Sequence, residues 1–377
     1  MSPRLRLFFY LLMGLALAFG FLHLFVDLGP YDPERLHIFL FNLCAGGTLL
    51  LYFTENQDTL SKRAVLFLAL SLFYALLAFF NQYLPAITVS LILAALVESC
   101  RIETFSFFPW EFFSRRESVS RKFHQAALLC LSLALIISAG VLTNNQYLRL
   151  VTFPKLELNV FFLGFSFPLS LITLSLIFFF FHDLKTISIR GVKEIIFWTI
   201  NLGVILFFLF ILAEQPTSQM VVTTLLFLAV IGTAILYFRF GKDTQQKNFL
   251  TSGIGFLLTT AVTGIAYILL EFLSGHSPDR YHWLMRLHAF VSLYGWNLSG
   301  LAVICRYNDF PIRLNTPGVI LFHWITVLVL APAGVFFRVA AVIALPCFML
   351  LLYLMLFSRA AGSADNNGRN GSRSARV

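Results

Sequence analysis

Charged residues are scarce in this sequence. Only 12% of its 377 residues are Asp, Glu, Lys or Arg, and only 18 are acidic, whereas a soluble domain carries about 25% charge. Hydrophobic residues make up 59%, with 44 Phe among them, and the mean hydropathy is +0.83. This composition excludes a soluble enzyme with a single anchor and predicts an integral membrane protein with many spans.

Cysteine spacings typical of metal and disulfide sites are also missing. The five cysteines form no CxxC pair, and each lies within or at the end of an apolar run. They are Cys44, Cys100, Cys130, Cys305 and Cys347. We therefore expect neither a disulfide framework nor a zinc site. The sequence contains no Ser–His–Asp arrangement, HExxH or Walker motif, and its glycine pairs inside apolar runs have no phosphate-binding context.

What the sequence has in abundance is long apolar stretches, and a membrane span needs about 20 such residues. We predict twelve spans, at 7–28, 37–54, 64–82, 85–100, 124–143, 158–181, 193–213, 220–238, 248–273, 284–305, 317–335 and 339–357. No soluble domain fits between them, so residues 1–358 are expected to form a single polytopic membrane domain. The Gly-, Ser- and Asn-rich tail 359–377 is expected to be disordered and cytoplasmic.

The basic residues are distributed unevenly between the loops. The segment 101–123 and the tail are rich in Lys and Arg, while loops such as "NQYLP" and "EQPTSQ" have none. Cytoplasmic loops carry such an excess, so both termini are predicted to be cytoplasmic in an inner (cytoplasmic) membrane. The basic residues of these cytoplasmic loops account for the net charge of +9. No nucleic-acid partner is therefore expected.

One phrase occurs twice and a third time in altered form. "PERLHIFLFNLCAGG" (33–47) and "LMRLHAFVSLYGWNLSG" (284–300) share a basic–Leu–His–x–Phe order, and "FPKLELNVFFLGFSFP" (153–168) has Glu157 in the histidine position. The copies open predicted spans 2, 6 and 10. This spacing predicts an all-α fold of three pseudo-repeated four-helix units, at about 1–100, 124–238 and 248–357.

Each copy has a basic residue two positions before the histidine or glutamate, and a small residue seven positions after it. The basic residues are Arg35, Lys155 and Arg286, and the small ones are Cys44, Gly164 and Gly295. Small residues leave room for a flat macrocycle, a cation can pair with its propionates, and two histidines can ligate haem iron. The alternative is close helix packing with basic residues that reach the membrane surface. Candidate cofactor-binding residues are His37, His288, Arg35 and Arg286.

Other histidines fall on both sides of the membrane. His23, His276 and His282 are expected on the same outer side as His37 and His288. Together they could form a metal entry site or a pH-sensitive patch, or they could be ordinary interfacial residues. His124 and His182 lie at cytoplasmic ends of spans. His323 lies toward the cytoplasm and is expected to be too deep to share a haem with His37 and His288.

Twelve spans with histidines near the outer ends of spans 2 and 10 resemble the catalytic subunit of the haem–copper oxidase superfamily. That superfamily includes nitric oxide reductases and divergent NnrS-type membrane proteins. The resemblance implies that His37 and His288 hold a low-spin haem near the outer face. "NVFFLGFSFP" in span 6 is similar to the family's Phe-Phe-x-Gly-His-Pro stretch, with Phe165 at the position of the copper-ligand histidine.

The sequence departs from the family where the oxidase chemistry would be. Phe165 cannot ligate a metal, span 7 lacks the family's His-His pair, and span 10 holds one histidine where the family has two. No copper, no high-spin haem and no oxygen-reductase activity are therefore expected. The resemblance then implies one b-type haem between His37 and His288, in electron transfer or in haem- or nitric oxide-related handling or sensing.

Two other classes of function stay open at this point. The repeats could form the substrate path of a transporter or permease, although such proteins usually consist of two halves with broken helices at mid-membrane. The chain could also be a cofactor-free assembly or partner subunit. In each case the lipid bilayer is the expected partner, with other membrane or electron-transfer subunits as candidates.

Overall fold

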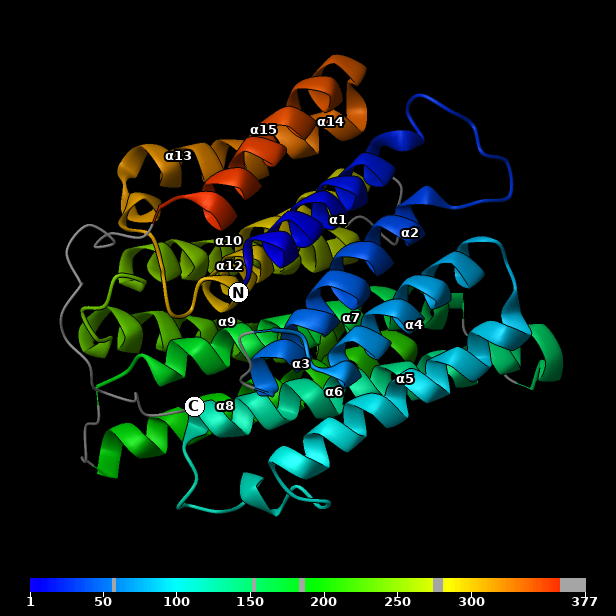
Figure 1. The fold of residues 1–377 in the computed structure, drawn as a ribbon. Coiled ribbons are helices and arrows are strands. Elements are labelled where there is room, and N and C mark those ends of the chain that lie inside the picture. The colour runs from blue at the N-terminus through cyan, green and yellow to red at the C-terminus, as the bar shows by residue number, and fades with distance from the viewer. Residues whose placement is uncertain (56–58, 151–153, 183–186, 274–280, 360–377) are drawn as a thin grey trace.

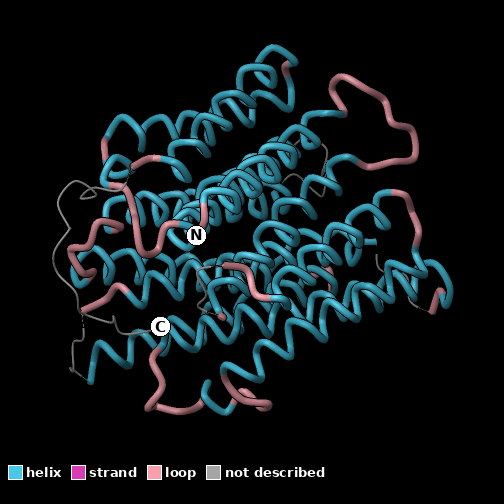
Figure 2. The backbone as a smooth tube through the Cα atoms, viewed as in Figure 1, coloured by secondary structure: helices cyan, strands magenta, loops and turns pink. Residues whose placement is uncertain are grey.

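The computed structural model describes residues 1–55, 59–150, 154–182, 187–273 and 281–359, without the side chains of 154–163, 187–188 and 282. Within these ranges the chain is helical and contains no strand (Figure 2). The long helices run side by side in one bundle (Figure 1). The predicted disordered tail lies almost wholly outside the described residues.

Helices of the first half are separated by short loops. They are α1 (Pro3–Leu22), α2 (Pro33–Ile38), η1 (Phe39–Gly47), α3 (Thr48–Thr54), α4 (Lys62–Phe79), α5 (Tyr83–Thr104), η2 (Trp110–Phe112), α6 (Val119–Thr143), η3 (Asn144–Leu148) and α7 (Pro154–Phe179). Four of these helices begin where a Ser or Asp side chain accepts a hydrogen bond from a first-turn backbone N–H, as helix N-caps do. The capping residues are Ser2, Asp32, Ser61 and Ser118.

The second half continues in the same way. Its helices are α8 (Ile187–Leu212), α9 (Pro216–Phe240), α10 (Lys247–Leu273), α11 (His282–Phe290), η5 (Val291–Asn297), α12 (Leu298–Cys305), η6 (Ile312–Asn315), α13 (Pro317–Ile325), η7 (Thr326–Leu330), α14 (Ala331–Phe336) and α15 (Arg338–Phe357). Several of them join end to end into one long helix, as in Pro33–Thr54 and Trp283–Cys305.

The helices support a multi-pass membrane protein. Eleven helices in the described ranges are long and apolar enough to span a bilayer, and α7, with 26 residues, occupies the remaining predicted span. The first span was predicted at 7–28, but the helix starts and ends earlier, as α1 ends at Leu22. In the loop that follows, Gly29 takes a left-handed backbone conformation (φ 60°). The division into three four-helix repeats stays a prediction.

The three segments with the repeated phrase lie at the centre of the bundle. The apolar window of Pro33–Thr54 is 89% buried and that of Trp283–Cys305 is 72% buried, against 22% for α8. α7 packs against η1, η5 and α12. Asn297 fixes this contact, because its amide donates to Ser166 and accepts a hydrogen bond of 2.8 Å from Ser170. The polar side chains of these spans therefore face one another instead of lipid.

Four of the labelled segments, η1, η3, η5 and η7, are π-helical. A π-helix has i→i+5 hydrogen bonds, is rare, and is frequently found at functional sites. Two of these segments, η1 and η5, directly follow the histidines of the repeated phrase. The wider turn changes which residues face the neighbouring helices from that point on.

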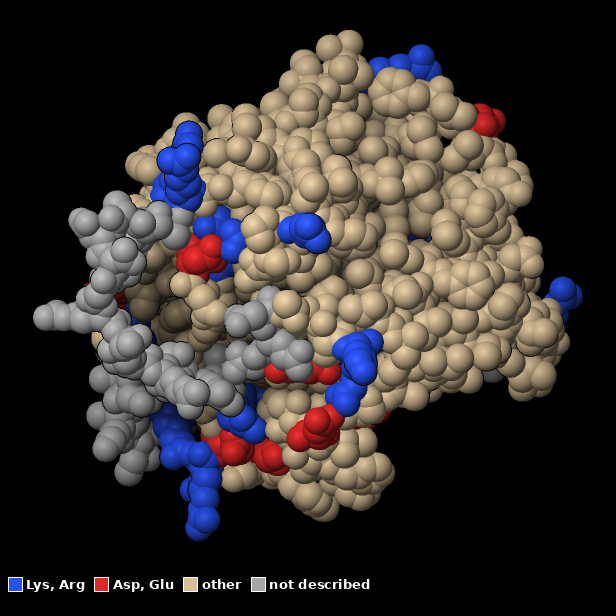
Figure 3. All heavy atoms as spheres, viewed as in Figure 1, with Lys and Arg blue, Asp and Glu red and all other residues tan. Residues whose placement is uncertain are grey.

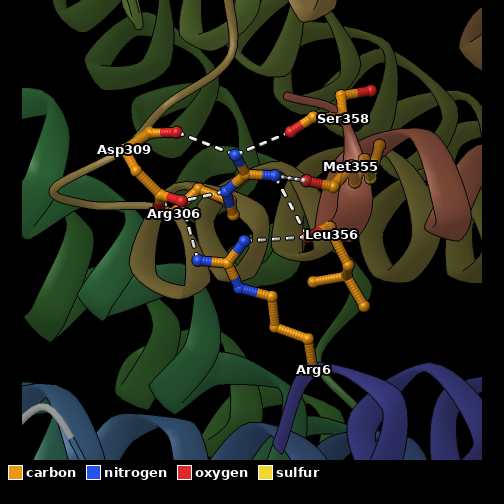
Figure 4. A network of polar contacts seen from close by, with 6 residues as sticks. All are labelled: Arg6, Arg306, Asp309, Met355, Leu356 and Ser358. Carbon is orange, nitrogen blue, oxygen red and sulfur yellow. Dashed lines mark hydrogen bonds and ion pairs between the residues drawn. The ribbon is translucent and has the colours of Figure 1, made fainter. Parts of the chain in front are cut away.

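A polar network ties the two ends of the described chain together (Figure 4). The Arg306 side chain is 1% exposed and donates to the carbonyls of Leu356, Ser358 and Asp309 and to the Asp309 carboxylate. Arg6, in the first turn of α1, donates to the same carboxylate at 2.7 Å and to the Leu356 carbonyl. The start of α1 and the end of α15 therefore lie at the same end of the bundle.

This end also carries much of the visible charge. In the space-filling view the long sides of the bundle are almost entirely uncharged, and most charged side chains gather toward one end (Figure 3). Apolar flanks and charged ends are the arrangement a bilayer requires. We refer to the end with Arg6 and Arg306 as the basic end.

Asp309 makes the stability of the network depend on pH. Burial alone would raise the pKa of its carboxyl group, but hydrogen bonds from Arg6 and Arg306 outweigh burial and hold the pKa below the ordinary value of 3.8. A lowered folded-state pKa contributes stability above the unfolded value, and this contribution is lost as the pH falls through the folded value. We expect the difference in thermal midpoint between the wild type and Asp309→Asn to be constant between about pH 5 and 8 and to shrink below about pH 4. A difference that is constant down to pH 3 would contradict the ion pairing.

Candidate functional site

His37 lies on α2 against the preceding helix, α1. Its ring nitrogen Nδ1 is 2.7 Å from the backbone carbonyl of Ala16. Gly20, one turn further along α1, makes room for the imidazole, because a Cβ there would lie 3.1 Å from Nδ1. The ring is buried, with 9% of the residue exposed.

His288 has the same arrangement on another pair of helices. Its Nδ1 is 2.9 Å from the carbonyl of Thr260 on α10 and 3.4 Å from the hydroxyl of Thr263. Gly264, one turn beyond Thr260, faces the ring, and a Cβ there would lie 3.2 Å from the imidazole carbon Cε1. A carbonyl and a glycine four residues apart thus form a pocket for each histidine.

The carbonyls determine which nitrogen of each ring carries the proton. A carbonyl only accepts hydrogen bonds, so Nδ1 is the donor, and in a neutral ring Nε2 then carries the lone pair. Histidines that ligate metals are held in this way, with the other ring N–H donated to a carbonyl or carboxylate. His37 and His288 therefore both present an Nε2 able to accept a proton or a metal.

Tyr294 occupies the space next to His37. Its hydroxyl lies 3.1 Å from Nε2 and 3.0 Å from Nδ1 of His37, and since Nδ1 donates to Ala16, the hydroxyl donates to Nε2. The Tyr294 ring is itself enclosed, with Phe41 at 5.0 Å, Phe348 at 4.8 Å and Phe290 at 5.7 Å between centroids. Aromatic rings from η1, α11 and α15 thus fill the space beside His37.

One feature of these contacts suits a haem and another does not. The tautomer of both imidazoles fits axial ligation, but the packing leaves no room for a macrocycle at His37 unless Tyr294 and its aromatic neighbours move. The space expected beside Gly295 is also taken, since a Cβ there would lie 2.5 Å from the ring of Phe256. Among the described residues no group of three His, Cys, Asp or Glu is placed to hold a metal ion.

The two predicted propionate partners lie in one cluster of charges. Arg286 forms an ion pair of 3.7 Å with Glu34, and Arg35 lies 3.9 Å from Asp32. Glu34 is also 3.7 Å from Nδ1 of His23. The Glu34–Arg286 pair connects α2 to α11 within one helical turn of each histidine. The structure therefore places His37 and His288 at similar depth, at the end of the bundle opposite the basic end.

The remaining predicted histidines have separate settings. His323 on α13 donates from Nε2 to the carbonyl of Tyr294 at 2.8 Å and contacts the ring of Phe256, so Tyr294 is a shared neighbour of His37 and His323. His124 bonds to the hydroxyl of Thr54 at 2.8 Å. His276 and the side chains of His282, Lys155 and Glu157 lie outside the described residues.

Several residues of the site were not predicted from the sequence, namely Ala16, Gly20, Thr260 and Tyr294. A signal was present for the glycines, because each lies in the span that precedes a histidine. Gly140 precedes Glu157 by the same 17 residues as Gly20 precedes His37. Two further glycines of α10 also lie close to neighbouring helices, since a Cβ on Gly253 would lie 3.0 Å from Ser299 and one on Gly255 would lie 2.8 Å from Trp324.

Comparison with known proteins adds no relative. No family model, no curated protein and no solved structure matches the chain.

Proposed function

We propose that this multi-pass membrane protein binds one b-type haem through His37 and His288 and acts in electron transfer or in haem- or nitric oxide-related handling or sensing. The duplicated histidine pocket carries the proposal. Two imidazoles at similar depth each donate Nδ1–H to a helix carbonyl, with a glycine one turn further on. Histidines that ligate a metal are held through the other ring N–H, and a haem with two histidine ligands needs two residues held in this way.

The protein's own residues have distinct tasks in this proposal. The carbonyls of Ala16 and Thr260 hold the two tautomers, and Gly20 and Gly264 fix the planes of the rings. Arg286 and Arg35 supply positive charge within one turn of the histidines. A bound haem would supply one-electron chemistry, and a diatomic ligand could bind its iron only by displacing one of the two histidines. Tyr294 must leave Nε2 of His37 before that nitrogen can ligate iron, so it controls access to the site.

The absorbance spectrum of protein purified from haem-replete cells tests the proposal. We expect a Soret band in the wild type, its loss in His37→Ala and in His288→Ala, and no change in the control His124→Ala, which removes a buried histidine with an ordinary hydroxyl partner. Tyr294→Phe removes the hydroxyl beside Nε2 and is expected to increase the haem bound at limiting haemin. The absence of a Soret band in both the wild type and Tyr294→Phe would contradict haem binding.

A cofactor-free assembly or partner subunit is the second candidate, and the ring packing around Tyr294 favours it. In that case the Tyr294–His37 hydrogen bond is permanent and stabilises the contact between η5 and α2. Tyr294→Phe would then lower the thermal midpoint without any spectral change. Iron and copper contents of the purified wild type separate the two functions, since a cofactor-free subunit contains less than about 0.1 equivalent of either metal, whereas a single bound haem adds one iron per chain.

A further inference from the structure

The loop between α5 and α6 leaves the bundle at the basic end and is held in a defined shape (Figure 1). Arg101 at the end of α5 is 3% exposed and donates to the carbonyls of Ser106 and Phe107 at 2.8 and 2.9 Å. Glu98 accepts two hydrogen bonds from the same guanidinium and one from Ser132 on α6. The backbone of the loop is therefore fixed to two membrane helices.

This fixed loop presents aromatic side chains outward. Its sequence, "FSFFPWEFF" (105–113), has four large side chains that are more than half exposed. They are Phe107 (66%), Phe108 (59%), Trp110 (71%) and Phe113 (69%). A soluble surface rarely exposes such a group, and aromatic side chains at the end of a membrane helix are typical of the boundary between headgroups and acyl chains.

A pocket of about 420 Å³ opens between this loop and α8. It is lined by Phe112, Phe113, Arg115, Lys122, Glu194 and Trp198. Phe112 contacts Phe197 edge to face at 5.5 Å, and Phe113 lies 5.3 Å from Trp198. The pocket thus has aromatic walls and charged groups, and it adjoins the exposed rings of the loop.

The charges around the pocket leave an excess of positive sign. The carboxylate of Glu194 accepts hydrogen bonds of 2.7 and 2.8 Å from the buried Lys122, and Glu117 pairs with Arg121 at 3.1 Å. Neither Arg115 nor Arg116 has an ion-pair partner in the ranges that the structure describes. With Glu117 and Glu194 already paired, the loop has one further carboxylate, Glu111, against the two cations Arg115 and Arg116.

We propose that the pocket binds the headgroup of an anionic phospholipid, with the phosphate held by Arg115 beside the Lys122–Glu194 pair. The acyl chains of the lipid run along the exposed rings of Phe107, Phe108 and Phe113. Charge complementarity selects the occupant, because arginine binds phosphate through paired N–H donors and basic segments beside spans attract anionic lipids. The proposal is independent of haem binding, since the pocket lies at the end of the bundle opposite His37 and His288.

Native mass spectrometry of the delipidated full-length protein in detergent tests the site. Phosphatidylglycerol and phosphatidylcholine with identical acyl chains are titrated separately. Both lipids carry a phosphate, but the choline cation of phosphatidylcholine offsets its charge, so we expect phosphatidylglycerol to bind about tenfold more tightly. Arg115→Gln should abolish this preference. Arg116→Gln is the matched control, because it removes the same charge from the neighbouring exposed position that does not line the pocket, and it should change binding less than about twofold.

Three outcomes would overturn the proposal. The first is equal binding of the two lipids by the wild type. The second is an equal loss of binding in Arg115→Gln and Arg116→Gln, which would indicate diffuse surface charge and no pocket. The third is displacement of the bound lipid by inorganic phosphate at equal concentration, which would indicate a simple anion site. Trp198→Ala provides an independent variant, expected to weaken both lipids because it removes a wall of the pocket and leaves the charges in place.

Discussion

Replacing Arg306 by Gln is expected to lower the free energy of unfolding by about 3–5 kcal/mol, the range for breaking a buried charge network. Arg306 donates to Leu356, Ser358 and Asp309, and no other described side chain reaches the Ser358 carbonyl. Gln is shorter and has one amide group, so it satisfies at most part of this set. The end of α15 and the loop after α12 would lose their common anchor.

The thermal midpoint of the detergent-solubilised protein measures this effect. Arg313→Gln is the matched control, because Arg313 lies in the same connection between α12 and α13 but is exposed. We expect it to change stability by less than about 0.5 kcal/mol. Limited proteolysis gives a second measurement, since release of α15 should open cleavage near residue 358 in Arg306→Gln alone. Equal midpoints for the two variants would contradict the role of the network.

The span pattern could be predicted from the sequence because a bilayer imposes one length and one polarity on every crossing helix. Span 10, predicted at 284–305, is found as Trp283–Cys305, and span 2, predicted at 37–54, as Pro33–Thr54. The early end of α1 was missed because the apolar run continues past Leu22, while the helix ends there. The C-cap residue His23 does not mark a helix end by itself, because the apolar run resumes with Leu24, Phe25 and Val26.

The π-helical segments and the role of Tyr294 could not be predicted in the same way. A π turn depends on how neighbouring helices fit together, and no residue type signals it in an isolated sequence. The carbonyl of Tyr294 lies in such a segment and bonds to His323, while its hydroxyl bonds to His37. The link from His37 to His323 through one tyrosine follows from three-dimensional packing.

The repeated phrase corresponds to two similar histidine pockets in the structure, but its small residues do not correspond to free space for a cofactor. Its histidines receive equivalent partners, Ala16 with Gly20 and Thr260 with Gly264. Its small residues are used differently, since a Cβ on Gly295 would meet Phe256. One pattern in the sequence thus combines a chemical feature with a packing feature, and the proposed haem would use only the first.

Substituting Gly300 by Ala is expected to destabilise the centre of the bundle by about 3 kcal/mol, the upper part of the range for overpacking. Gly300 on α12 lies against Thr173 on α7, and a Cβ at Gly300 would come within 2.7 Å of the Thr173 Cβ and closer still to its hydroxyl oxygen. Thr173 is fully buried, and its hydroxyl is bonded to the Leu169 carbonyl at 2.7 Å. A β-branched side chain in this position cannot rotate away, so the two central helices must separate.

A double-substitution cycle identifies the contact responsible. Thr173→Ala removes the obstructing atoms, so Gly300→Ala with Thr173→Ala should recover much of the stability that Gly300→Ala loses, and the two effects should not add. Gly318→Ala is the control, because nothing lies within 4 Å of a Cβ at that helical position, and it should be neutral or slightly stabilising. Wild-type stability in Gly300→Ala would mean that α7 and α12 are further apart than the structure places them. Additive losses in the double variant would assign the effect to a neighbour other than Thr173.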